Sequence, residues 1–185
     1  MVWVIVVIVA LVLLVGVAVY LFNRVVRLRN EVDTGWSNID VQLKRRNDLI
    51  PNLVETVKGY AAHERGVFEE VTNARGAVAR AQSPAEAGAA DSLLGQALGR
   101  LFAVAEAYPD LKASQNFLEL QAELTDTEDK IAAARRYYNA TVLAYNTAIQ
   151  TFPALLFAGP LGFRAREFFD APEGEREPVA VSFAT

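Results

Sequence analysis

The chain begins with an unbroken apolar run, Val2–Phe22, in which Trp3 and Tyr20 are the only side chains that carry a polar group. A charge-free run of this length is what a helix needs to cross the ~30 Å hydrocarbon core of a bilayer. Trp3 and Tyr20 lie near its two ends, where amphipathic rings favour the membrane interfaces. The pattern predicts a transmembrane anchor over residues 1–23.

The charges that flank this run predict its orientation. No charged side chain precedes it, whereas Arg24, Arg27 and Arg29 follow it directly. Because Lys and Arg accumulate on the cytoplasmic side of a span, we expect the N-terminus outside and the remaining chain in the cytoplasm. A cleaved signal peptide would need a cationic start, a shorter apolar core and a small-residue cleavage site beyond it. The one candidate site, Gly16-Val17-Ala18, lies inside the run, so we expect the anchor to be retained.

Beyond the anchor, apolar positions recur at alternating steps of three and four. The first series is Val32, Trp36, Ile39, Leu43, Ile50, Leu53, Val57 and Tyr60. This period is typical of a helix with a coiled-coil-like seam. Pro51 interrupts it, and an interior proline removes one hydrogen bond and clashes with the preceding turn. The sequence therefore leaves two alternatives, a kink near residues 47–51 or a new helix that starts at Pro51.

Two more helices follow. Ser83-Pro84-Ala85-Glu86 has the order of an N-cap, a first-turn proline and a capping glutamate, so a helix should run from here to about Ala107. After Tyr108-Pro109-Asp110, helical spacing continues to Phe152 without Gly or Pro. The domain at 24–170 is thus expected to be all-α. Residues 171–185 are expected to form a flexible tail, and the only credible strand, 179–183, lies within that tail. We expect the core to form where two sets of residues pack against each other: Trp36, Ile39, Leu43, Leu53 and Val57 against Leu120, Leu124, Ile131 and Tyr138.

An apolar segment at 154–163 follows the last long helix, and its Gly and Pro residues prevent it from extending that helix. It must pack on the bundle, touch the membrane or meet another subunit. If the last helix ends at the membrane, this segment lies beside the start of the first helix. The predicted interaction surface is Leu155, Leu156, Phe157 and Phe163.

Composition excludes several functional classes. The net charge of −4 gives no reason to expect nucleic-acid binding, and zero Cys excludes disulfides, thiol nucleophiles and Cys-based zinc sites. His63-Glu64 could begin a zinc motif, but Val67 stands where the second histidine would be. The sequence also lacks a phosphate-binding loop and a nucleophile elbow. We therefore predict no catalytic residue, metal ligand or cofactor.

Arg46 falls on the apolar seam, where a buried arginine is costly unless it is paired. Glu119 or Glu123 of the last helix could form a buried ion pair with it. The alternative is a small phase drift that lets Arg46 extend its guanidinium to water.

Several motifs together resemble the bacterial LemA family. They are residues 28–32, 36–64, 116–124 and 127–139, with Tyr145-Asn146, Phe152-Pro153, Gly162-Phe163 and Phe168-Phe169. Gly35 departs from the pattern, because Ala is expected before the tryptophan. The resemblance covers about residues 20–170 and implies a single-span anchor in a bacterial inner membrane, a cytoplasmic antiparallel bundle of four helices and no established enzymatic activity. One relative is associated with building magnetosome membranes.

These observations favour a non-catalytic scaffold that is anchored in the membrane and self-associates at its inner face. Its expected partners are the lipid bilayer, further copies of the chain and, in a second reading, another membrane protein. In that reading the chain is an adaptor or regulatory subunit of a membrane protease or sensor. A metal or ligand-binding protein with an unrecognised site is the remaining alternative.

Overall fold

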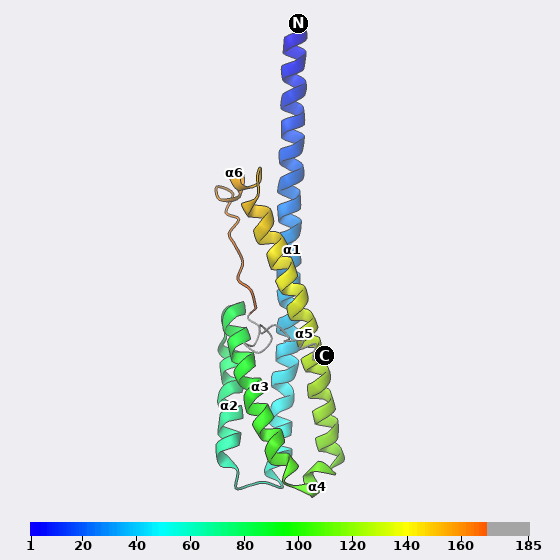
Figure 1. The fold of residues 1–185 in the computed structure, drawn as a ribbon, viewed down its shortest axis with the longest axis vertical. Helices are drawn as coiled ribbons and strands as arrows, with labels where there is room; N and C mark the ends of the chain where they lie inside the picture. Colours follow the sequence, from blue (N-terminus) through cyan, green and yellow to red (C-terminus); the bar gives the residue numbers. More distant parts are fainter. Residues whose placement is uncertain (170–185) are drawn as a thin grey trace, which may run out of the picture.

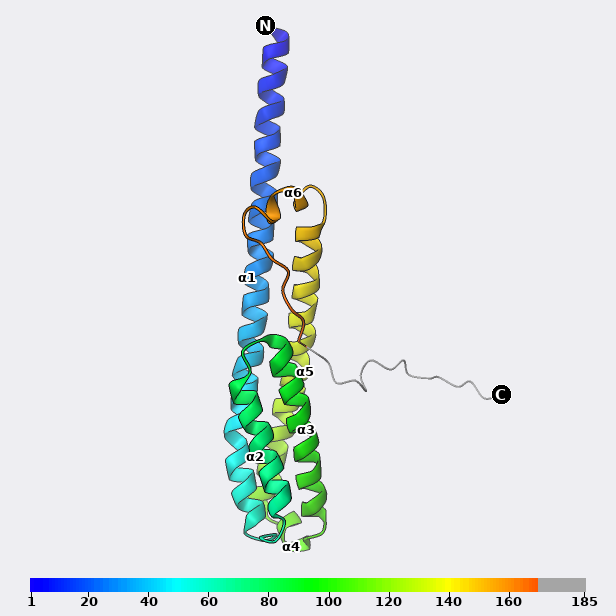
Figure 2. The ribbon, with the colours of Figure 1, turned by 90° about the vertical axis from the view of Figure 1, so that its left-hand side faces the viewer.

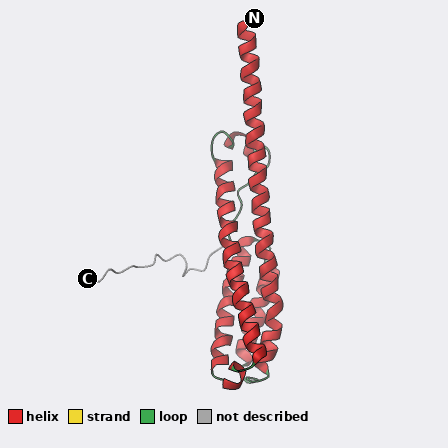
Figure 3. Ribbon diagram, turned by 90° about the vertical axis from the view of Figure 1, so that its right-hand side faces the viewer, coloured by secondary structure: helices red, strands yellow, loops and turns green. Residues whose placement is uncertain are grey.

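The computed structural model describes residues 1–169, so the expected tail at 171–185 and the candidate strand at 179–183 lie outside the described part. The helices are α1 Val2–Lys58, α2 Arg65–Arg80, α3 Pro84–Glu106, α4 Pro109–Lys112, α5 Gln115–Gln150 and α6 Leu155–Ala158. Residues 1–169 contain no strand, which confirms the all-α prediction (Figure 3). The long helices alternate in direction, α1 and α3 down and α2 and α5 up in the view of Figure 1.

A single helix, α1, carries the chain from the apolar run to the far end of the bundle (Figure 1). Its 57 residues correspond to about 85 Å at ~1.5 Å per residue. Pro51 lies inside it, so the alternative of a new helix at Pro51 is wrong. The proline leaves the Asn47 carbonyl without its usual helical donor. Arg75 of α2 donates from Nε to that carbonyl at 3.2 Å, so a neighbouring helix satisfies the group that Pro51 cannot.

The apolar seam stops earlier than its spacing predicts. Helix α1 ends at Lys58, and Tyr60 is exposed, so its expected place in the seam is wrong. The start of α3, by contrast, matches the prediction. Ser83 Oγ accepts a hydrogen bond from the Glu86 amide at 3.2 Å, and the Glu86 carboxylate accepts one from the Gln82 amide at 2.8 Å. The Ser83 bond is one half of a capping box, while the Glu86 carboxylate binds the residue before the N-cap in place of the N-cap itself.

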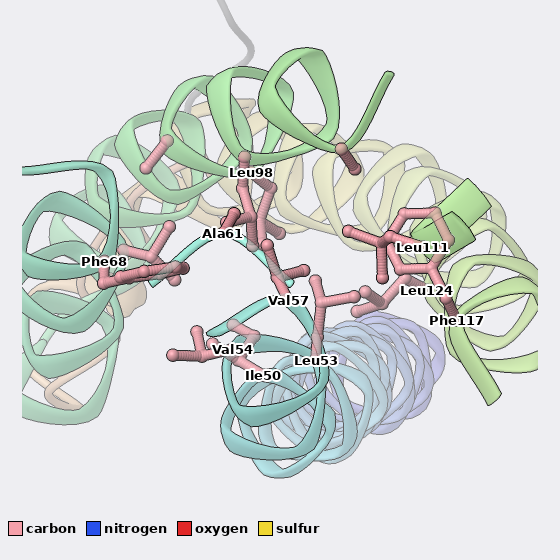
Figure 4. Packing of buried hydrophobic residues seen from close by; sticks show 14 of the residues in the cluster. Ile50, Leu53, Val54, Val57, Ala61, Phe68, Leu98, Leu111, Phe117 and Leu124 are labelled. Carbon is pink, nitrogen blue, oxygen red and sulfur yellow. The ribbon is translucent and has the colours of Figure 1, made fainter. Parts of the chain in front are cut away.

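The bundle has two cores along its length. The membrane-distal core lies among α1, α2, α3 and α5 and is shown in Figure 4; it includes Leu53, Val57, Phe68, Leu101 and Leu124. The membrane-proximal core lies mainly between α1 and α5; it includes Val25, Val32, Tyr138, Tyr145 and Phe169. Figure 2 shows the reason: α2 and α3 reach only part of the way up the α1–α5 pair, and α6 lies above them. The expected core is confirmed except that Trp36 and Leu120 are only partly buried.

Gly35 lies where α1 and α5 come close together. A Cβ at this position would stand 3.3 Å from the Tyr138 Cα and 3.5 Å from the Thr141 hydroxyl oxygen. The glycine that departs from the family pattern therefore permits a tight approach of the two helix backbones.

Candidate membrane-proximal surface and buried ion-pair cluster

The apolar run at the start of α1 has the length and composition of a membrane span. Within residues 1–169, α1 is the one helix long and apolar enough to cross a bilayer, and no residue of its most apolar part is buried in the protein. Trp3, Tyr20 and the three following arginines, Arg24, Arg27 and Arg29, are all exposed. The helix indicates that the protein is membrane-associated, whereas the N-outside orientation stays a prediction.

A cap of residues 151–163 closes the end of the bundle next to this span (Figure 2). Helix α5 ends at Gln150, the chain turns through the short α6, and Gly162 adopts a φ of +79° that a side chain would disfavour. The Phe163 amide then donates to the Ala158 carbonyl at 2.9 Å. The Phe163 ring packs edge to face against Phe22 of α1, with 5.8 Å between the ring centroids. The cap is thus fixed at the last residue of the apolar run.

The outer face of the cap is apolar. Four of its side chains are largely exposed: Phe152 at 80%, Leu155 at 57%, Leu156 at 69% and Leu161 at 55%. Phe157 is partly buried and Phe163 is 8% exposed, so Phe163 belongs to the core and its predicted place on the surface is wrong. It is buried because α1 continues past the cap and offers Phe22 as a partner. The sequence prediction also left out Phe152 and Leu161, although both lie in or beside the apolar segment.

A groove of about 300 Å³ lies next to the cap, between α1 and the end of α5. Its lining includes Leu21, Arg24 and Leu28 of α1 and Ala148 and Thr151 from the other wall. It therefore opens at the level where the apolar run ends and the first arginine begins.

A strap of residues 164–169 runs from the cap back along α1 and α5 (Figure 1). Two asparagines of α5 hold it, each through a pair of hydrogen bonds. The Asn146 amide donates to the Arg166 carbonyl at 2.9 Å and accepts from the Arg166 amide at 2.8 Å. Asn139 makes the same pair with Phe169, at 3.0 and 2.9 Å. The side-chain amides thus satisfy a strap backbone that forms no secondary structure of its own.

Aromatic side chains of α1 and α5 also contact the strap. The Tyr138 hydroxyl donates to the Glu167 carbonyl at 2.8 Å, and burial raises the pKa of Tyr138 to about 12, so the hydroxyl stays protonated. Phe169 is buried beside Trp36, with 6.4 Å between ring centroids. Arg166 adds an exposed ion pair to Asp33 of α1 at 2.7 Å. Sequence reasoning did not assign these roles, although Tyr138-Asn139 and Tyr145-Asn146 repeat at a spacing of seven, which is typical of one helix face.

Arg46 is buried and paired, as one of the two alternatives predicted, but the predicted partners are wrong. Its Nη1 lies 2.7 Å from Asp91 Oδ1 of α3 and 2.8 Å from Glu128 Oε2 of α5. Glu123 instead pairs with Arg45 at 2.5 Å, and Glu119 accepts a hydrogen bond from Gln115. Glu119 and Glu123 are exposed and turned away from the core, because they do not share the helix face of Glu128 that meets Arg46.

This cluster ties three helices together. The side chains of Arg46 and Asp91 are 6% and 9% exposed, whereas that of Glu128 is 53% exposed. Burial raises the pKa of Asp91, and the nearby positive charge of Arg46 opposes that rise. A buried pair of this kind fixes helix register more than it adds stability. Among residues 1–169, no group of three or more His, Cys, Asp or Glu side chains is placed to hold a metal ion.

A model of the LemA family matches residues 35–183. The chain is 29% identical over 181 residues to the magnetosome protein MamQ of Magnetospirillum gryphiswaldense, a match that covers 83% of this chain and 66% of the relative. It is 30% identical over 164 residues to protein LemA of Metamycoplasma hominis, covering 86% and 74%. The chain therefore spans slightly less than two thirds of the length of the magnetosome relative.

Proposed function

The chain belongs to the LemA family, and on that premise we propose that it is a non-catalytic scaffold, anchored in the membrane by α1, that self-associates through its bundle at the inner face. The names of its relatives fit such a role, since one of them is called a magnetosome protein. Helix α1 supports the proposal because it passes without a break from the span into the bundle. A bundle on such a helix is held in a fixed direction relative to the membrane.

The observation that carries self-association is an open face of α5. Residues Ala140, Leu143, Ala144 and Thr147 are all exposed, and they follow the i, i+3, i+4, i+7 spacing of one helix face. No charged residue occurs between residues 137 and 163. Small side chains let a second helix approach closely, and an exposed uncharged stripe is unusual on a solvated helix. We take a second copy of the chain as its occupant.

The mass of the intact assembly in mild detergent tests this proposal. Self-association predicts a mass that is a multiple of the 20.2 kDa chain. Leu143→Glu should shift it toward one chain, because it places a charge in the middle of the stripe. Leu93→Glu is the matched control, since Leu93 is similarly exposed (55% against 59%) but lies on α3. A single chain for the unmodified protein would contradict self-association, and a second protein in fixed ratio would favour the adaptor reading instead.

A further inference from the structure

The outer face of the cap lies where the membrane surface must be. The apolar run of 21 residues, Val2–Phe22, is about 31 Å long as a helix, close to the ~30 Å of the hydrocarbon core. It ends at Phe22, whose ring contacts Phe163. Four exposed apolar side chains, Phe152, Leu155, Leu156 and Leu161, are therefore carried on a cap attached to the last turn of the span.

The charges of this end of the molecule match an anionic lipid surface. Residues 1–30 and 137–166 contain no Asp or Glu and five arginines, of which Arg166 pairs with Asp33; the other four are Arg24, Arg27, Arg29 and Arg164. The chain as a whole has a net charge of −4, so this end of the molecule is more basic than the rest. Arginines near the headgroups favour anionic lipids, whereas a cluster of carboxylates there would be repelled.

Exposed apolar side chains next to arginines are typical of a segment that lies in the interface without crossing it. We propose that the cap is a second membrane-binding element, in which Phe152, Leu155, Leu156 and Leu161 insert among the lipids while Arg24 and Arg164 meet anionic headgroups. This rests on the membrane anchorage in the proposed function, but not on self-association.

The bundle would then be held at the membrane by two contacts, one through the span and the other through the cap. A single helix can rotate about its own axis and tilt in a bilayer, because packing and interfacial anchors set both angles. An inserted cap on one side of α1 would restrict both motions. The open face of α5 would consequently point in a constant direction along the membrane plane.

Depth-dependent quenching on the full chain tests the proposal. The chain has no Cys, so single cysteines can carry an environment-sensitive fluorophore at chosen positions. Leu156→Cys reports on the cap, Val12→Cys on the span and Leu93→Cys on the exposed surface of α3. Each labelled protein is reconstituted in vesicles of phosphatidylcholine and phosphatidylglycerol that contain lipids with spin labels either near the headgroup or deep in the chain.

The proposal predicts that the label at Leu156 loses fluorescence mainly to the shallow spin label, that the label at Val12 loses it mainly to the deep one, and that Leu93 loses little to either. Vesicles of phosphatidylcholine alone should give a smaller loss at Leu156, since the arginines then lack anionic partners. If Val12 is quenched but Leu156 is not, the anchor holds and the cap proposal is wrong. If Val12 is not quenched, the membrane anchorage itself fails. A Leu156 label that is shielded from both water and lipid would be buried against protein, which also contradicts lipid insertion.

Discussion

The two halves of the bundle cover the apolar seam between α1 and α5 with different elements. In the membrane-distal half, α2 and α3 cover the seam between α1 and α5, and the core consists mainly of aliphatic side chains. In the membrane-proximal half those two helices contribute only their upper ends, such as Ala87 of α3, and Phe163 of the cap and Phe169 of the strap cover the seam instead. The same helical period therefore continues along α1 and α5 while the number of covering elements changes.

Because different elements cover the seam, the two halves should also differ in stability. The distal half is closed by four helices whose backbone groups pair within each helix, whereas the strap depends on Asn139 and Asn146 for its backbone hydrogen bonds. Segments with few covering contacts open at lower free energy than a cooperative core. We therefore expect the distal half to determine global stability and the proximal half to open locally.

The largest effect is expected at Asp91 in the distal half. Asp91→Ala removes the buried partner of Arg46 and leaves its guanidinium with the partly exposed Glu128, which should lower the unfolding free energy of the bundle by about 3–5 kcal/mol. Chemical denaturation in mild detergent, followed by helical circular dichroism, measures this. Glu128→Ala is the control, with a cost below about 1 kcal/mol because that carboxylate is half exposed. Equal effects of the two variants would show that Arg46 does not depend on a buried partner.

Leu124 tests the apolar packing of the same half. It is 5% exposed in the distal core, so Leu124→Ala should cost about 2–5 kcal/mol. Leu118→Ala, on the same helix but exposed, should change stability by no more than about 0.5 kcal/mol. A distal core would be the wrong description if both variants unfolded at the same denaturant concentration.

Loss of a hydrogen bond to the strap should lower stability less than the two changes in the distal core, and its effect should stay local. Asn146→Ala leaves the amide and carbonyl of Arg166 without their partners, at an expected cost of about 1–3 kcal/mol. Hydrogen exchange should become faster in the proximal part of α5 and stay unchanged in α2 and α3. Asn116→Ala, at an exposed position in the first turn of α5, serves as control. Faster exchange throughout the molecule would indicate one cooperative unit in place of two.

The smallest effect is a pH dependence at Asp91. Burial holds its folded pKa above the unfolded value of about 3.9, so the folded state binds the proton more tightly. This contribution to stability is fully present below the unfolded pKa and is lost as the pH rises through the folded one. The unfolding free energy of the unmodified protein, minus that of Asp91→Asn, should therefore fall as the pH rises above about 4. A difference that rises over this interval would mean that pairing with Arg46 outweighs burial.

Local patterns in the sequence predicted the elements well. The apolar run and the N-cap at Ser83 depend on residues close in the chain, and both match the structure. The helix expected from residue 110 to Phe152 is mostly present, but it is divided into α4 and α5 and ends at Gln150. The end of α1 at Lys58 was missed because the apolar spacing continues to Tyr60, and a single glycine at 59 is a weak stop signal.

Pairings between distant residues were harder to predict. Arg46 was expected to meet a carboxylate on the last helix, and it does meet one there, although this is Glu128 and not Glu119 or Glu123. Its buried partner Asp91 was missed. Asp91 lies on the apolar stripe of Ala87, Leu94 and Leu98, and a charge on that stripe could have identified it. The strap gave no comparable signal. Its hydrogen bonds join residues 20 and 30 positions apart, and no local period records which asparagine meets which backbone group.

The central claim is that α1 continues as one helix from the span into the bundle, so that the bundle extends away from the membrane surface. The part of α1 after Phe22 is about 54 Å long at ~1.5 Å per residue, so its far end should lie well above the lipid surface. Energy transfer to acceptor-labelled lipids measures this directly, with donors on His63→Cys at the distal loop and Leu156→Cys on the cap of the full chain in vesicles. The account predicts strong transfer from Leu156 and weak transfer from His63. Equally strong transfer from both positions would mean that the bundle lies flat on the membrane and would contradict it.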